Sequence, residues 1–297
     1  MIINPLLFSE MELPVTRAGA PERNFQSLRH PLWTQSKAHL IRDYLKLFTM
    51  VTRHGTYIDG FAAPQESDHP EMWSAKLVLE NDPKWMRDFW LCDLNPSGTS
   101  RLEALAIEHR SKSRRISVLT GDFNLTVDEV LASPRIKETT ATFALLDQRT
   151  FECSWETVQK LARRKTGRKI ELFYFFATGW VDRSIAAVAR EETAAKVERW
   201  WGRADWRSLQ GMESVLRAKM VAARFKDELG YAYAHPYAIH SARRGGRTMY
   251  HMIHATDHPD ASPLMIRAYR KISGRPEIES SSQQGSLEEL WGALEEE

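Results

Sequence analysis

The sequence predicts an α/β fold of the Rossmann type, a mostly parallel sheet with helices on both faces. Five short apolar runs of β character alternate with segments whose apolar residues recur at helical spacing. Four of these runs end on or near an aspartate: Asp59, Asp93, Asp122 and Asp147. Because right-handed crossovers bring the carboxyl ends of parallel strands to one edge, we expect these carboxylates to meet there.

The first strand and its loop, Tyr57–Gln65, form the centre of this prediction. Tyr57-Ile58 is a short β-like run that ends on Asp59 and Gly60. Gly60 permits a tight turn in which backbone N–H groups approach a ligand. An acidic residue between a strand and a loop of small residues is typical of the floor of a nucleotide site.

The elements around this strand follow in alternation. Lys37–Val51 has the apolar spacing of an amphipathic helix, which His54-Gly55 is expected to end. Asn95-Pro96-Ser97 is a helix start and Ser154 a helix N-cap. The other expected elements are helices at Ala75–Glu80, Arg101–His109, Val127–Leu131 and Ser154–Leu161, and strands at Arg87–Asp93, Ile116–Leu119, Thr142–Leu146 and Ile170–Phe176.

The C-terminal part is expected to form a helical and hairpin lobe that begins at about residue 180. Residues 180–230 are mostly of helical character and include a long amphipathic helix that Gly230 stops. Two β-like runs, Tyr231–His240 and Thr248–Thr256, are joined by paired glycines that indicate a hairpin. Pro263–Ile272 is the last expected helix.

The chain is thus divided into an extended N-terminal arm at 1–30, a domain at 31–273 and a flexible acidic tail at 274–297. With 297 residues, 42% of them apolar and 27% charged, it can bury a normal core. A net charge of +2 implies neither strong attraction to nucleic acid nor repulsion.

Cysteine content and hydropathy bound the location of the protein. Two cysteines, Cys92 and Cys153, cannot form a disulfide framework, which favours the reducing cytoplasm. No apolar run approaches the ~18 residues of a membrane span, and the N-terminus lacks the basic start of a signal peptide. We therefore expect a cytoplasmic protein without a membrane partner.

The segments together resemble the three-Cys-motif partner family, bacterial and phage proteins with a methyltransferase-like Rossmann fold. The matches span about residues 30 to 270. Those that carry the resemblance are Trp33 with Lys37 and Tyr44-Leu45, the loop Tyr57–Ala62, Gly121–Asn124, Phe143–Asp147, Glu171–Phe173, and Tyr250–His258 with Met265. The resemblance implies S-adenosylmethionine as the ligand and a radical-type protein with a three-cysteine motif as a possible partner.

Two motifs depart from the family pattern. The family loop continues Gly-Pro-Gly, whereas this chain has Ala63-Pro64-Gln65, and alanine adopts positive φ less easily than glycine. The fourth strand of the family ends Asp-Pro-Phe-Gly, whereas this chain has Asp147-Gln148-Arg149-Thr150. Both changes fall at positions where the resemblance places cofactor binding and catalysis.

The resemblance implies cofactor contacts from Asp59, Gly60, Phe61, Ala62, Asp93, Asp122 and Phe123. Asp59 would lie near the methionyl end, and Asp93 would accept from the ribose hydroxyls. Asp122 would accept from the adenine amine while Phe123 stacks on the ring. The structural alternatives are a carboxylate that caps a turn for Asp59, and a helix cap beside a core aromatic residue for Asp122 and Phe123.

The candidate catalytic residues are Asp147, Gln148 and Lys37. Asp147 with Gln148 would act as a general base or orient an amine, because methyl transfer depends mainly on the positioning of the nucleophile. The alternative is that Asp147 survives from a lapsed site. Lys37 could reach the site from the opening helix, although a surface lysine is the more common case.

Histidines and basic runs suggest two further possibilities. His251 and His254 should face opposite sides of a strand, which argues against a metal site. Three basic runs, at Arg110–Arg115, Arg163–Lys169 and Arg243–Arg247, could form a nucleic-acid surface or could lie in solvent.

The leading hypothesis is methyl transfer from S-adenosylmethionine to a nitrogen of a nucleotide or nucleic acid. The second is a catalytically degenerate adaptor that binds a protein or nucleic acid, with the tryptophan-rich segments near residue 200 and the proline-rich N-terminal arm as its contact surface. The third is metal-dependent hydrolysis of nucleic acid by the same carboxylates, for which the spacing shows no specific signature.

Overall fold

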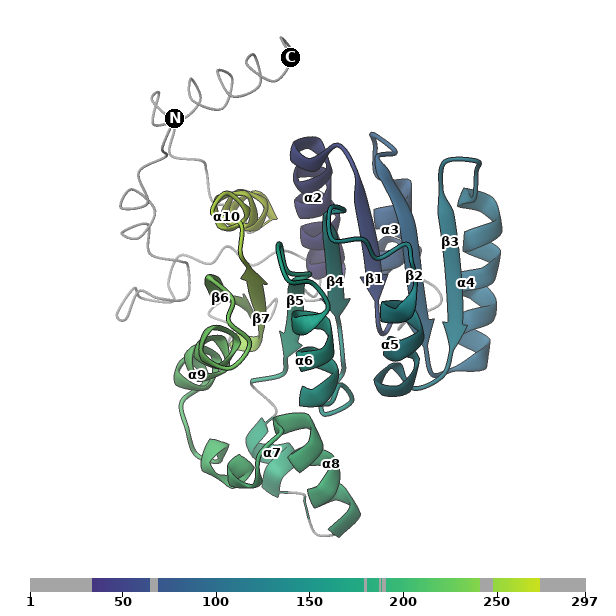
Figure 1. The fold of residues 1–297 in the computed structure, drawn as a ribbon. Helices are drawn as coiled ribbons and strands as arrows, with labels where there is room; N and C mark the ends of the chain where they lie inside the picture. The colour runs from purple at the N-terminus through teal and green to yellow at the C-terminus, as the bar shows by residue number, and fades with distance from the viewer. Residues whose placement is uncertain are drawn as a thin grey trace, which may run out of the picture.

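The computed structural model describes residues 34–64, 69–178, 181–186, 188, 191–240 and 248–272. They form one seven-stranded sheet in the order β3-β2-β1-β4-β5-β7-β6, with helices on both faces (Figure 1). The strands are β1 Gly55–Asp59, β2 Met86–Asp93, β3 Arg115–Thr120, β4 Thr142–Leu146, β5 Glu171–Phe176, β6 Tyr233–His240 and β7 Thr248–Thr256. This arrangement confirms the predicted Rossmann-type α/β fold.

Strands β1 to β5 pair in parallel, and β7 pairs antiparallel with both β5 and β6. Every residue of β1, β4 and β5 is buried, as expected for central strands covered on both faces. The hairpin predicted between the last two strands therefore continues the main sheet beyond β5. Its paired glycines lie outside the described residues, as do the N-terminal arm, the tail and Gln65.

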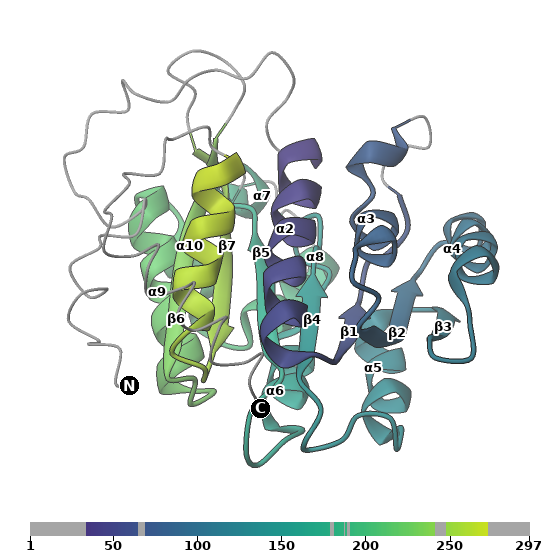
Figure 2. The ribbon, with the colours of Figure 1, turned by 90° about the horizontal axis from the view of Figure 1, so that it is seen from above.

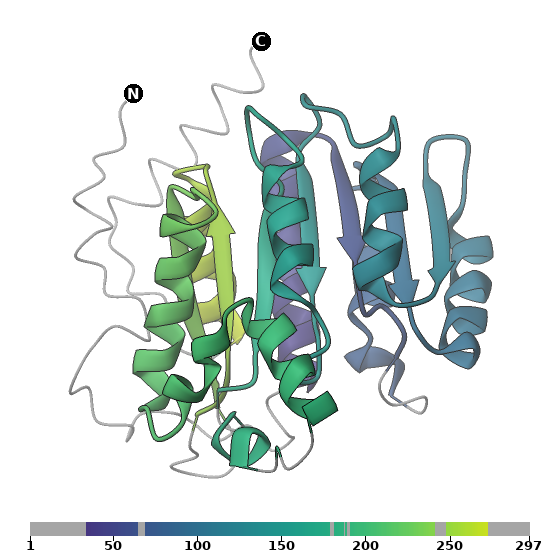
Figure 3. The ribbon, with the colours of Figure 1, turned by 60° about the horizontal axis from the view of Figure 1, so that its bottom comes forward.

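Helices cover the two faces of the sheet in separate groups, which Figures 2 and 3 show from different sides. The helices are α2 Thr34–Thr52, α3 Ser74–Glu80, α4 Pro96–His109, α5 Phe123–Ala132, α6 Trp155–Arg163, α7 Val181–Ala186, α8 Glu191–Trp201, α9 Ser214–Asp227 and α10 Ala261–Ile272, with 3-10 turns η2 Pro70–Met72 and η3 Ala204–Leu209. Side chains of α2, α3, α4 and α10 form one apolar layer with the sheet. Those of α5, α6, α8 and α9 form the other.

Two local expectations are wrong. Gly55 does not end the first helix, because it is the first residue of β1, and α2 instead ends through Arg53 in a left-handed conformation at φ 57°. The tryptophans near residue 200 are not a contact surface. Trp200, Trp201 and Trp206 expose 1–3% of their surface because they fill the layer between α6, α8, α9 and the sheet.

The structure confirms the cap at Ser154, whose side chain accepts from the backbone N–H of Thr157 at 3.2 Å. It also confirms that His251 and His254 face opposite sides of β7, because one bonds Thr178 and the other bonds Glu171. Over the ranges described, no helix is long and apolar enough to cross a membrane.

Candidate functional site

The candidate site lies at the carboxyl ends of β1, β2 and β4. From β1 the chain builds β2 and β3 on one side and then returns to place β4 on the other. The sheet therefore has its topological switch point between β1 and β4, where open α/β sheets bind ligands. Two connected cavities occur at this edge.

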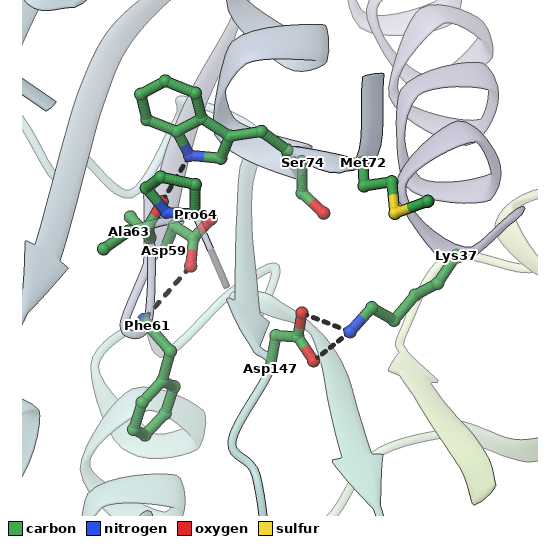
Figure 4. Close-up of a pocket in the computed structure, with 10 residues that line it drawn as sticks. Lys37, Asp59, Phe61, Ala63, Pro64, Met72, Ser74 and Asp147 are labelled. Carbon is green, nitrogen blue, oxygen red and sulfur yellow. Dashed lines mark hydrogen bonds and ion pairs between the residues drawn. The ribbon is translucent and has the colours of Figure 1, made fainter. Parts of the chain in front are cut away.

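The smaller cavity is a pocket between α2, the β1 loop and the turn before α3 (Figure 4). It is lined by Lys37, Asp59, Phe61, Ala62, Ala63, Pro64, Met72, Trp73, Ser74 and Asp147. The indole N–H of Trp73 donates to the carbonyl oxygen of Ala62 at 2.6 Å, which fixes the loop against this wall. The pocket thus brings together three charged groups from α2, β1 and the loop after β4.

Lys37 and Asp147 form a buried ion pair in this pocket. The Nζ atom of Lys37 lies 2.7 Å from Oδ1 and 2.6 Å from Oδ2 of Asp147. The same ammonium group lies 4.5 Å from the ring centroid of Phe175. Lys37 exposes 4% of its surface, so the surface-lysine alternative is wrong.

Asp59 has a buried carboxyl group that accepts two hydrogen bonds. It accepts from the hydroxyl of Tyr57 at 2.9 Å and from the backbone N–H of Phe61 at 3.1 Å. Burial raises the pKa of Asp59 to about 7, while both hydrogen bonds oppose that shift and the charges of Asp147 and Asp93 add to it. Asp59 can therefore hold or release a proton near neutral pH.

The larger cavity is a groove of about 970 Å³ that runs from the ends of β1 and β2 to α8. Phe61, Ala63 and Asp147 line both the groove and the pocket, so the two cavities meet at these residues. Other predicted residues on its walls are Gly60, Asp93, Asp122 and Phe123. Nine of the ten predicted site residues thus line one or both cavities, the exception being Gln148.

Asp93 and Asp122 both hold backbone groups in place. Asp93 accepts from the N–H of Ala63 at 3.0 Å and from that of Asn95 at 2.9 Å, so it ties the β1 loop to the end of β2. Asp122 caps α5 by accepting from the N–H of Asn124 at 2.9 Å. The capping alternative for Asp122 is confirmed, and its cofactor contact stays a prediction. A carboxylate has further lone pairs, so both residues can also accept from a ligand.

Gly60 is required by close packing. A Cβ atom on Gly60 would lie 2.5 Å from Cδ1 of Phe123, and Gly60 has no positive φ. Phe123 exposes only 2% of its surface, so it has little free area on which an adenine ring could stack. Ala63 also lacks a positive φ, and its methyl group fits because Gly98 of α4 has no side chain there.

Gln148 organises the loop after β4. Its Oε1 accepts from the N–H groups of Glu152 at 3.1 Å and Cys153 at 2.9 Å. Its amide nitrogen donates to the carbonyl oxygen of Phe175 at 3.2 Å. All three partners are main-chain groups, and Gln148 exposes 1% of its surface. This placement supports a structural role beside Asp147, and a catalytic role for Gln148 stays a prediction.

Sequence reasoning missed several residues of the site. Leu94 and Leu125 line the groove next to Asp93 and Asp122 and expose 71% and 74% of their surfaces. Trp73 and Met72 line the pocket from a 3-10 turn that no sequence pattern indicated. Leu94 could have been found by its position directly after the acidic end of β2.

Several residues of the described basic runs are buried or form ion pairs within the protein. Arg114 and Lys165 are buried, Arg115 pairs with Asp88 at 2.8 Å, and Lys169 lies 3.7 Å from Asp257. Both runs precede strands and so lie at the amino ends of the sheet, away from the groove. The run Arg243–Arg247 lies outside the described residues. Within the described ranges, no group of three or more His, Cys, Asp or Glu side chains could hold a metal ion.

Comparisons with known proteins identify no family for this chain. No family model matches the chain, and a search of curated proteins gave no match. A crystal structure of a protein from Legionella pneumophila strain Philadelphia 1, described with the family model DUF519, is similar with a TM-score of 0.40 and 9% identity. The similarity covers 85% of this chain and 94% of that one. Likeness at this level carries no argument about function.

Proposed function

We propose that the protein is a methyltransferase that uses S-adenosylmethionine. The observation that carries the proposal is the convergence of Asp59, Asp93, Asp122 and Asp147 on two connected cavities at the switch point of the sheet. S-adenosylmethionine has an ammonium group, a sulfonium centre, ribose hydroxyls and an adenine amine. These are donors and cations, which carboxylates bind.

S-adenosylmethionine would extend across both cavities. Asp59, in the pocket, would hold the ammonium group. Asp93, in the groove, would accept from the ribose hydroxyls. Leu94 and Leu125, rather than the packed Phe123, offer exposed apolar surface for the adenine ring.

Asp147 would bind the acceptor, because it lies where the pocket and the groove meet. When bound, S-adenosylmethionine supplies an electrophilic methyl group. The Oδ atoms of Asp147 would accept a hydrogen bond from the acceptor N–H and so aim the nitrogen lone pair. Lys37 would be a positioning residue, because its two contacts fix the orientation of the Asp147 carboxylate.

The family resemblance supports the same proposal. An antiparallel seventh strand between the fifth and sixth strands is what a methyltransferase-like Rossmann fold implies, and β7 has this position. Membership of the three-Cys-motif partner family, and a radical-type protein as partner, are part of the proposal and rest on the sequence motifs alone.

Calorimetric titration with S-adenosylmethionine tests the proposal. We expect saturable binding to the wild type and at least tenfold weaker binding to Asp93→Asn, because the amide replaces one acceptor oxygen with a donor. The control is Asp227→Asn, an exposed aspartate at the end of α9, which should bind like the wild type. No heat and no thermal shift with the wild type would reject the proposal.

A catalytically degenerate adaptor is the second candidate. It is favoured by the packing of Phe123 against Gly60 and by the use of the Ala63 N–H within the protein, because both reduce the groups available to a cofactor. Light scattering with a candidate three-cysteine-motif protein separates the two. A stable complex together with no cofactor binding would support the adaptor.

A further inference from the structure

We infer that the α8 side of the groove is a binding site for a phosphate-bearing ligand, either a free nucleotide or a nucleic-acid strand. Three cationic side chains line this part of the groove, Arg149 from the loop after β4 and Lys196 and Arg199 from α8. Helix α8 lies at the end of the sheet to which the arrowheads of β1 to β4 point (Figure 1). The three cations therefore lie at the same edge as the candidate site.

These three side chains differ from the other cations of the groove in having no carboxylate partner among the described residues. Two other cations on the groove wall are neutralised: Lys160 by Asp128 at 2.9 Å and Glu156 at 3.3 Å, and Arg203 by Glu228 at 2.5 Å. In the part of the chain that the structure describes, Arg149, Lys196 and Arg199 form no ion pair, and all three are exposed. They are free to bind an anion.

Two acidic side chains on the groove wall, Glu152 and Glu198, reduce the positive charge of this part of the groove. Glu198 is exposed on the same helix. Glu152 uses its Oε2 atom to accept from the backbone N–H of Arg149 at 2.8 Å. Of the other acidic residues on the groove wall, Asp93, Asp122 and Asp128 lie at the β2 and α5 side. Asp147 and Glu156 are paired with Lys37 at 2.6 Å and with Lys160 at 3.3 Å. The groove therefore has an acidic side at β2 and α5, and at α8 it has three cations that form no ion pair with a described residue.

The volume and the chemistry of the groove favour a phosphate ester. A volume of about 970 Å³ is at the upper end of what one small ligand needs, which leaves room for a second ligand beside a nucleoside. Two guanidinium groups match the oxygens of a phosphate with paired donors, and a lysine adds a compact charge. A cationic ligand would prefer the acidic half and an anionic one the half with α8.

The position of Arg149 links this site to the chemistry. Arg149 is two residues after Asp147, so a phosphate bound there would hold the rest of its nucleotide close to the proposed acceptor carboxylate. The role of this ligand as methyl acceptor rests on the proposed function. Phosphate binding itself does not, and it can be measured without S-adenosylmethionine.

Fluorescence anisotropy with a labelled single-stranded 12-nucleotide RNA, at low salt and without S-adenosylmethionine, tests the inference. The test variant combines Arg149→Gln, Lys196→Gln and Arg199→Gln. The control combines Arg163→Gln, Arg168→Gln and Lys112→Gln, exposed cations at the amino ends of the strands that form no ion pair with any described residue. Both variants remove two arginines and one lysine, so they change the net charge equally.

We expect the test variant to bind RNA at least tenfold more weakly than the wild type, and the control to change less than threefold. The slope of log affinity against log salt should also fall in the test variant, by roughly 0.7 for each phosphate that it no longer neutralises. If adenosine monophosphate displaces the labelled RNA, the site binds phosphate and accepts a free nucleotide. If only unlabelled RNA displaces it, the site binds phosphate as part of a nucleic-acid strand.

Three results would overturn the inference: no binding to the wild type of either the RNA or, by calorimetry, adenosine monophosphate; equal weakening in both variants; or equal competition by polyglutamate, which carries charge without phosphate. Calorimetry with S-adenosylmethionine on the test variant distinguishes the proposed phosphate site from the proposed binding of S-adenosylmethionine. RNA binding that depends on these cations, in a protein that does not bind S-adenosylmethionine, would support the inference and reject the proposed function.

Discussion

At the level of single residues, the charge state of Asp59 determines what the small pocket binds. Its carboxyl group is buried and receives donors from Tyr57 and Phe61, yet burial outweighs them and raises its pKa to about 7. A cationic group brought next to Asp59 would favour the ionised form. Binding of an ammonium-bearing ligand should therefore release a proton near neutral pH.

We predict that Asp59→Asn flattens the pH dependence of stability. Asp59 titrates near 4 in the unfolded chain and at about 7 in the folded one, so the folded state binds the extra proton between these values. The contribution of protonated Asp59 to the free energy of unfolding is therefore fully present below pH 4 and is lost as pH rises through 7. The free energy of unfolding falls over this range with a slope of at most roughly 1.4 kcal/mol per pH unit. Urea unfolding between pH 5 and 8 measures it. Identical slopes in variant and wild type would contradict the prediction.

We predict that Lys37→Met destabilises the protein strongly, because it leaves Asp147 buried without its partner. Breaking a buried ion pair from one side costs roughly 3–5 kcal/mol. The double variant Lys37→Met with Asp147→Leu should recover most of that loss, because both charges are then removed. A double-mutant cycle by urea denaturation tests this. Additive losses would mean that the two side chains do not interact.

The sequence allowed the carboxylates to be predicted but not how each is used. Their position after apolar strands is enough to place them at one edge, because strand direction fixes that edge. Gln148 was predicted beside Asp147, but its three main-chain partners depend on how the loop at Glu152 and Cys153 returns to the sheet. Nothing in the local pattern specifies that path.

At the level of elements, helix α2 is bonded to the sheet through side chains at two positions along its length. Lys37 bonds Asp147 after β4, and two turns later the hydroxyl of Tyr44 bonds Glu171 at the start of β5. Glu171 also accepts from His254 at 2.9 Å and Thr256 at 3.0 Å, so β7 joins the same network. The helix that carries Lys37 is thus held at both ends of the strands it covers.

The turn after β1 depends on a contact distant in sequence. We predict that Gly60→Ala lowers the free energy of unfolding by about 1–3 kcal/mol, because its methyl group would overlap Phe123. Adding Phe123→Leu should restore part of the loss. The control Gly167→Ala has no atom within 4 Å of the added methyl group and should be nearly neutral. Thermal unfolding compares the variants, and equal effects at both glycines would reject this role of Phe123.

Elements were predictable where composition is uniform. The range Thr142–Leu146 of β4 is predicted with the bounds that the structure has, because four consecutive apolar residues after Thr142 favour a short buried strand. The end of α2 cannot be predicted in the same way, because Arg53 takes the left-handed conformation that glycine usually adopts at the end of a helix. Gly55 is needed in β1 instead, since a Cβ atom there would lie 2.7 Å from the sulfur of Met86.

At the level of the whole molecule, the sheet separates stability from binding. Its two faces are covered by the apolar layers of α2, α3, α4 and α10 and of α5, α6, α8 and α9. The described basic runs support the amino ends of the strands, whereas the groove and pocket occupy the carboxyl ends. Substitutions on the exposed groove wall should therefore change ligand binding with little effect on folding.

Leu94 provides the sharpest test of that separation. It exposes 71% of its surface on the groove wall, so Leu94→Ala should change the free energy of unfolding of the apoprotein by no more than about 0.5 kcal/mol. A saturating ligand at 100 times its Kd stabilises a protein by about 2.7 kcal/mol. We expect S-adenosylmethionine to raise the Tm of the wild type and to raise that of Leu94→Ala much less at the same concentration.

The matched control is Leu216→Ala on α9, an equally small change at a residue that exposes 53% of its surface and does not line the groove. It should show the full ligand-induced shift in Tm. If both leucine variants keep the full shift, the adenine ring does not contact Leu94 and must be held elsewhere in the groove. If the wild type shows no shift, the carboxylates at the strand ends serve the fold alone, and the adaptor becomes the better account of the molecule.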